Sequence, residues 1–227
     1  MAVVFTNTVN AQTNTNQRLT AQQEAIVRIA ALTGKGDLEN LKTELDAGLE
    51  AGLTVNQIKE ALMHVYAYAG FPRSLRGLQT FMVVLDERKT KGINDTMGAE
   101  ASPIDEDRSK YDRGKAILEE LTGVTETGPK TGYAAFAPTI EIFLKEHLFA
   151  DIFERDVLNY TERELVTVSV LSSIGGVEPM LRSHLNLCLN VGLTPDQLQH
   201  FVGVIKQTVG GEEAKTAQKV LDEVLKQ

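Results

Sequence analysis

The sequence predicts an all-α fold made of two tandem homologous helical units. Apolar residues recur at the three-to-four-residue spacing of amphipathic helices, and the alternation typical of strands is nearly absent. Residues that cap helices stand at the start of successive apolar stretches. A stretch of 19 residues near the N-terminus also recurs in the C-terminal half. Together these features indicate two copies of one helical unit.

Residues 19–90 are expected to form the N-terminal unit. Its first helix begins at Thr20, where Gln23 completes a capping box. Its later helices are opened by residues that favour helix starts, namely Asp37, Thr54 with Gln57, and Pro72. Glycines mark the ends of the first three helices, because glycine readily adopts the left-handed conformation that follows a helix.

Residues 91–110 are expected to be a linker, because apolar residues become scarce there and Gly, Ser and Pro are scattered among charges. Residues 111–227 form the second predicted unit. Its first two helices are expected over 111–121 and 138–152, the latter with an apolar side made of Ile142, Phe143 and Phe149.

The next helix carries the sequence LVTVSVL, whose β-branched residues would also suit a strand. Thr161 and Glu164 stand directly before it at the spacing of a capping box. This cap and the helical surroundings favour a helix.

The internal repeat aligns GLTVNQIKEALMHVYAYAG, from Gly52, with GLTPDQLQHFVGVIKQTVG, from Gly192. The offset is 140 residues (192 − 52), and five of the 19 positions are identical. These identities fall on the helix cap and on both helix ends. The preceding helix keeps this offset, with Leu45 and Leu49 opposite Leu185 and Leu189. The helix before that fits at offset 141, with the slip in a glycine-containing turn. The repeat therefore indicates two homologous units of roughly 70–90 residues.

The composition excludes several classes of protein. With 23 Lys and Arg against 31 Asp and Glu, the net charge is −8, which makes nucleic acid a poor default partner. No apolar run approaches the roughly 18 residues needed to cross a bilayer. A single cysteine, Cys188, excludes an intramolecular disulfide and any CxxC pair.

The first residues, MAVVFTNTVNAQ, are similar to the tail of a secretory signal that lacks its basic region and most of its apolar core. As written this segment is too short to direct export. Residues 1–18 are therefore expected to be a disordered tail or signal remnant of a cytoplasmic protein. A true start upstream of Met1 would instead imply a periplasmic or exported protein.

Several segments together resemble the carboxymuconolactone decarboxylase family, within the alkylhydroperoxidase-like superfamily. They are IKEALMHVYAYAGFPRSL, KYDRGKAILEELTG, FLKEHLFADIFERDVL and TERELVTVSVLSSIGGVEPMLRSHLNLCLNVGLTPDQL. The resemblance implies an all-helical, oligomeric protein. Because single-unit members form rings of six units, a tandem member is expected to be a homotrimer, a pseudo-hexamer.

Alkylhydroperoxidases of this superfamily carry a Glu, then a CxxC, then a His four residues later. Here the CxxC position falls in GGVEPM, which contains no cysteine. Peroxide reduction through a disulfide needs an attacking and a resolving thiol, so its usual form is not available. Glu164 and His184 match the Glu and the His of the pattern, with one extra residue between them.

Three residues of the C-terminal unit are catalytic candidates: His184, Glu164 and Cys188. Their helices are joined by a short turn and are expected to be antiparallel, which makes a Glu164–His184 hydrogen bond feasible. Each residue also has a purely structural alternative. Glu164 would complete the helix cap, His184 would be a satisfied interior histidine, and Cys188 would be a small buried side chain.

In the N-terminal unit, His64 and Tyr68 share one stripe of a helix, whereas their partners in the repeat are Val204 and Thr208. This difference predicts one composite site per pair of units, with His64 and Tyr68 binding substrate; simple drift is the alternative. Arg73 and Arg182 are candidates for holding a substrate carboxylate, or are exposed charges. His147 and His200 are expected on the surface. The dispersed histidines predict no metal site, and no cofactor is expected.

Three functions fit these features. The first is an enzyme that acts by proton transfer on a small carboxylated lactone or related acid, through decarboxylation (a lyase) or isomerisation. His184 would then be the acid, Glu164 its orienting partner and an arginine the carboxylate anchor. The second is a thiol-dependent antioxidant protein with peroxiredoxin activity at Cys188. The third is a non-catalytic oligomeric binding protein.

Overall fold

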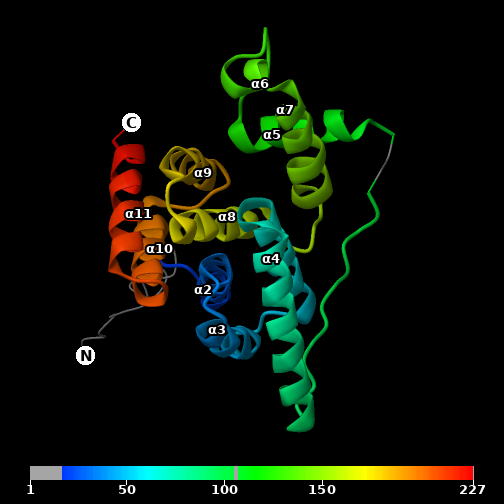
Figure 1. Cartoon of the computed structure of the whole chain (residues 1–227), viewed down its shortest axis with the longest axis vertical. Helices are drawn as coiled ribbons and strands as arrows, with labels where there is room; N and C mark the ends of the chain where they lie inside the picture. Colours follow the sequence, from blue (N-terminus) through cyan, green and yellow to red (C-terminus); the bar gives the residue numbers. More distant parts are fainter. Residues whose placement is uncertain (1–16, 105–106, 227) are drawn as a thin grey trace, which may run out of the picture.

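The computed structural model describes residues 17–104 and 107–226, and the expected tail at residues 1–18 lies almost entirely outside them. The fold is all-α, and the described residues contain no strand. Two helices, α2 (Ala21–Lys35) and α8 (Tyr160–Ile174), pack extensively against each other at the centre of the molecule. The helices of residues 38–90 and 178–224 lie around this pair, whereas those of residues 110–143 lie together at the upper end of the molecule (Figure 1).

The N-terminal unit consists of α2, α3 (Leu38–Glu50) and the long α4 (Val55–Thr90). The predicted capping boxes at Thr20 and Thr54 are both present, and Asp37 caps α3. Helix α4 is interrupted at Gly70, whose φ of 78° and ψ of 165° are not helical. The helix resumes at Pro72, so the two helices predicted for this stretch form one kinked element.

The segment expected to be a linker folds back along α4 (Figure 1). Its backbone carbonyls at Thr96 and Met97 accept hydrogen bonds from Val55 N (3.0 Å) and Asn56 N (2.9 Å). The first N–H groups of a helix have no acceptor within the helix, and this segment provides the acceptors for α4. Arg88 also binds Asp95 of the segment at 2.8 Å.

The segment predicted to open the C-terminal unit contains α5 (Lys110–Thr122), α6 (Gly132–Phe136), α7 (Pro138–Phe143) and the π-helix η1 (Leu144–Phe153). The single helix expected over 138–152 is therefore divided into an α-helical and a π-helical part. The expected apolar side was wrong in part: Phe149 is buried, but Ile142 is 40% exposed and Phe143 58% exposed. The wider turns of a π-helix change which positions share a face, so an α-helical pattern does not place them correctly.

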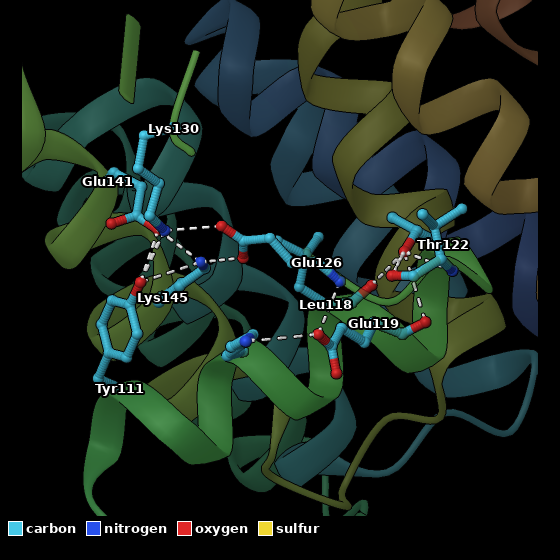
Figure 2. Close-up of polar contacts among 10 residues, drawn as sticks. Tyr111, Leu118, Glu119, Thr122, Glu126, Lys130, Glu141 and Lys145 are labelled. Carbon is cyan, nitrogen blue, oxygen red and sulfur yellow. Dashed lines mark hydrogen bonds and ion pairs between the residues drawn. The ribbon is translucent and has the colours of Figure 1, made fainter. Parts of the chain in front are cut away.

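A partly buried ion cluster ties η1 to α7, to the loop before α6 and to α5 (Figure 2). The Lys145 ammonium, 2% exposed, binds Glu141 at 2.5 Å and also binds Glu126. Tyr111 donates its hydroxyl to Glu141 at 2.9 Å, and Lys130 pairs with both glutamates. Lys145 and Glu141 are buried, whereas Lys130 and Glu126 are partly exposed, and the two lysines and two glutamates balance in charge.

Helix α8 does not begin as predicted. Its N-cap is Asn159, whose side chain accepts from Glu162 N at 2.9 Å. The Thr161 hydroxyl instead donates to the Val191 carbonyl at 2.9 Å. The cap predicted at Thr161 with Glu164 was therefore wrong, because an overlapping Asn159–Glu162 pair takes that role. Glu164 lies one turn inside the helix and is free for another partner.

The rest of the C-terminal unit is α9 (Glu178–Asn190), α10 (Pro195–Thr208) and α11 (Gly211–Val224). Helices α2, α3 and α4 share one hydrophobic core with α8 to α11. Helix α4 packs on α8, and α10, which matches the first part of α4 in the internal repeat, packs on α2. This packing brings side chains of α4 to the residues of α8 and α9.

Candidate active site

A hydrogen bond joins α8 to α9 at the centre of the candidate site. His184 Nδ1 lies 2.8 Å from Glu164 Oε2, and the glutamate side chain has no exposed surface. A carboxylate only accepts hydrogen bonds, so Nδ1 carries the proton in this bond. His184 Nε2 makes no hydrogen bond within the described residues, and the side chain is 13% exposed. One ring nitrogen is thus fixed, and the other is free for a ligand.

Helix α4 of the N-terminal unit completes the site. The Tyr68 ring meets the His184 ring edge-on, with centroids 5.7 Å apart and planes at 86°. On its other side Tyr68 stacks on His64, at 5.6 Å and 15°. The structure therefore brings His64 and Tyr68 of α4 close to His184 of α9; that they form one composite site stays a prediction.

Both ring nitrogens of His64 are occupied by residues of α8. Arg163 Nη1 lies 3.2 Å from Nδ1, and Thr167 Oγ1 lies 2.9 Å from Nε2. Arg163 in turn pairs with Glu60 at 2.8 Å, and all four side chains are buried. Sequence reasoning missed Glu60, Arg163 and Thr167. Two signals were available: Glu60 stands one helical turn before His64, and Arg163 adjoins Glu164 in a largely apolar helix.

Burial governs the protonation of the site. Burial, then the Arg163 charge, then His184 lower the pKa of His64 well below its ordinary value, so this imidazole is neutral. Burial and the nearby Glu164 raise the pKa of Tyr68, so its phenol keeps its proton. Two buried oxygens, Tyr68 Oη and Glu164 Oε1, have no hydrogen-bond partner of normal geometry in the described part of the chain. Such atoms are rare in folded proteins and commonly mark a place for water or a ligand.

Cys188 lies one turn beyond His184 on α9 and has no exposed surface. Burial and the nearby Glu164 raise the pKa of its thiol well above the ordinary value. The thiolate is the reactive form of cysteine, so this environment opposes nucleophilic chemistry.

The two arginine candidates have different surroundings. Arg73 lines a surface pocket of about 370 Å³ together with Tyr68, Lys35 and Ser173, and forms no ion pair within the described ranges. Arg182 is exposed and pairs with Glu223 of α11, outside the site. Of the two arginines, Arg73 thus shares a pocket with Tyr68, whereas Arg182 already has an acidic partner.

The two remaining histidines lie elsewhere. His147 is exposed, as expected, and pairs with Asp151 at 3.0 Å. His200 was expected on the surface but is only 16% exposed, and its ring accepts a hydrogen bond from Leu19 N at 3.1 Å. Among residues 17–104 and 107–226, no three His, Cys, Asp or Glu side chains are placed to hold a metal ion. None of the helices described is long and apolar enough to cross a membrane.

These features define an all-helical protein of two interlocked units with a Glu–His site at their junction. The model of the carboxymuconolactone decarboxylase family matches residues 4–81 and 138–223, which is well over half of the chain. The chain therefore belongs to the carboxymuconolactone decarboxylase family, in a tandem two-unit form. A 4-carboxymuconolactone decarboxylase of Acinetobacter baylyi is 26% identical over 121 residues, which cover 53% of this chain and 90% of that protein.

Proposed function

We propose that this protein is an enzyme that transfers a proton during decarboxylation or isomerisation of a small carboxylated lactone or related acid. The observation that carries the proposal is the 2.8 Å bond between buried Glu164 and His184 Nδ1, which leaves Nε2 free. An oriented imidazole with one free nitrogen suits general acid–base catalysis near neutral pH. Family membership supports the class of substrate.

In the decarboxylation, the carbon–carbon bond to the carboxylate breaks and carbon dioxide leaves. The electron pair of that bond moves into the conjugated carbonyl of the lactone. His184, protonated on both nitrogens in this step, then gives its Nε2 proton to the carbon and becomes a neutral imidazole that keeps its Nδ1 proton in the hydrogen bond to Glu164. Glu164 holds the imidazole and balances its positive charge. The protonated phenol of Tyr68, in edge contact with His184, is suited to donate a hydrogen bond to the developing enolate oxygen.

The carboxylate anchor in this proposal is Arg73. Its guanidinium has no acidic partner in the described structure, and it shares a pocket with Tyr68, whose ring contacts His184. Guanidinium binds carboxylates in a bidentate manner, so Arg73 would orient the substrate next to Tyr68. Cys188 has no part in this mechanism, because its thiol is buried and protonated.

The proposal includes a homotrimer, as the family resemblance implies. Large apolar side chains are exposed along the second half of α4, among them Phe71 (62%) and Met82 (64%), and on α6 and α7, among them Phe136 (92%). Exposed apolar surface of this kind commonly marks an interface. Light scattering should give three times the chain mass of 24.9 kDa, and a 24.9 kDa species at micromolar concentration would refute the trimer.

The test of the activity uses carboxylated γ-lactones in heavy water, with carbon dioxide release and deuterium incorporation as the two readouts. His184→Asn keeps a donor for Glu164 but cannot shuttle a proton, so both readouts should fall by at least about 100-fold. Arg73→Met should raise KM by roughly 10-fold or more, as expected for a lost charged contact. The matched control is Arg76→Met, since Arg76 lies one turn further along α4 and binds only Gln79. Tight ligand binding without either readout would favour the non-catalytic binding protein.

A further inference from the structure

The strongest feature outside the Glu164–His184 pair is a closed hydrogen-bond circuit around His64. A guanidinium only donates, so the 3.2 Å contact from Arg163 Nη1 makes His64 Nδ1 an acceptor. The ring proton must then lie on Nε2, which donates to Thr167 Oγ1 at 2.9 Å. The Thr167 hydroxyl donates onward to the Arg163 backbone carbonyl at 3.0 Å. Both ring nitrogens of His64 and the hydroxyl of Thr167 are thus used inside the protein, whereas Arg163 Nε has no partner among the described residues.

We propose that His64 is a positioning residue, locked as the neutral Nε2–H tautomer, whose ring holds Tyr68 against His184. This inference rests on the proposed function for its kinetic test, but its structural part stands independently. It replaces the substrate-binding role expected for His64, because neither ring nitrogen is left for a ligand.

The lock on His64 is electrostatic as well as geometric. Arg163 from α8, itself paired with Glu60 of α4, would be repelled by a protonated His64. From the other elements, the ring faces Phe153 of η1 edge-on at 5.1 Å and His184 of α9 beyond Tyr68. Protonation would break the Arg163 contact and place positive charge between Arg163 and His184. The circuit thus keeps the space beside His184 free of a second cation.

The direct test is a long-range proton–nitrogen NMR spectrum of the full chain, which contains only four histidines. His64 should show its proton on Nε2 and an unprotonated Nδ1, unchanged between about pH 5 and 9. A proton on Nδ1, or titration of the ring within this range, would overturn the proposal. This measurement needs neither a variant nor a substrate.

The second test breaks the circuit with Thr167→Val, which keeps the shape of the side chain and removes the acceptor for Nε2–H. The matched control is Thr33→Val, because Thr33 is also buried and its hydroxyl also binds the carbonyl one turn back, at Ile29. Thr167→Val should speed solvent exchange of the His184 Nδ1–H and lower kcat by about 10-fold, with KM within about two-fold, since misplaced groups lose turnover.

Equal kcat and equal exchange rates in Thr167→Val and Thr33→Val would refute the positioning role. Failure of the proposed function would look different, because the tautomer and the exchange rates would be as expected while no variant showed turnover. If Thr167→Val does not fold, the tautomer of His64 in the unaltered protein still decides the proposal.

Discussion

Replacing His184 separates the structural contribution of its pairing with Glu164 from its chemical contribution. His184→Ala would leave a carboxyl group with no exposed surface and no hydrogen-bond partner, because Oε1 of Glu164 is already unpaired. Two opposite charges roughly 4 Å apart attract by about 4 kcal/mol at an effective dielectric constant near 20. Removing one member of a buried pair typically destabilises a protein by about 3–5 kcal/mol. We expect a loss of that size, which is a large part of a stability of about 5–15 kcal/mol.

The companion variant is His184→Asn, whose amide nitrogen reaches the position of Nδ1 and can still donate to Glu164. Its free energy of unfolding should fall by only about 1–2 kcal/mol, the value of a weakened hydrogen bond. Both variants should lose turnover by about 100-fold to 10,000-fold, because neither side chain can carry a proton at Nε2. The two variants therefore differ in stability and agree in activity.

The assays are urea unfolding followed by circular dichroism and turnover measured as deuterium incorporation. Equal stability of His184→Ala and the unaltered protein would show that the hydrogen bond contributes nothing to the fold. Turnover within a few-fold in His184→Asn would show that His184 is not the proton carrier. Either outcome would refute the corresponding half of the reasoning.

Three further predictions concern other parts of the molecule. Because burial raises the pKa of the Cys188 thiol, its alkylation in the folded protein should be at least about 100-fold slower than in urea. Cys188→Ser should keep turnover within a few-fold, and fast alkylation or complete loss of activity would make the thiol a nucleophile. Burial raises the pKa of Glu141, but hydrogen bonds from two lysines and a tyrosine outweigh this effect and lower the pKa to about 2, so the stabilising contribution of Glu141 is complete above about pH 4.5 and is lost as the pH falls towards 2. Glu141→Gln should flatten the dependence of the free energy of unfolding on pH in that window, and an unchanged dependence would contradict the pairing. Gly114→Ala would place a methyl group 1.8 Å from a backbone carbonyl of η1 and should lower the free energy of unfolding by about 3 kcal/mol or more. The control Gly203→Ala, with nothing within 4 Å, should leave the stability unchanged or raise it by up to about 1 kcal/mol, and equal melting temperatures of the two variants would disprove the close packing of α5 on η1.

Short-range signals in the sequence were sufficient for most of the helices. The boxes at Thr20 and Thr54 are present because a cap depends only on residues three positions apart. The same property explains the error at α8, where Asn159–Glu162 and Thr161–Glu164 overlap and both have the required spacing. A residue 30 positions away distinguishes the two caps, because the Thr161 hydroxyl donates to the Val191 carbonyl and does not cap the helix.

The sequence also indicated that Glu164 and His184 pair and singled out His64 and Tyr68, which lie beside that pair. Two helices joined by a short turn place residues at comparable distances from the turn side by side, so this pairing follows from chain connectivity. The repeat singled out His64 and Tyr68 because they align with Val204 and Thr208, which lack an imidazole and a phenol. Between the two arginines, however, nothing local distinguished Arg73 from Arg182.

By itself, then, the sequence determined the all-α class, the two repeated units and the identity of the Glu–His pair, because helix periodicity, caps and short connections act over a few residues. Only the tertiary structure decided the surroundings of that pair. Arg163 and His64 are 99 positions apart, and Thr167 and His64 are 103 apart, so no local pattern joins them. They meet because α4 of one unit packs on α8 of the other, and it is this packing that buries the charges and fixes the orientation of the rings.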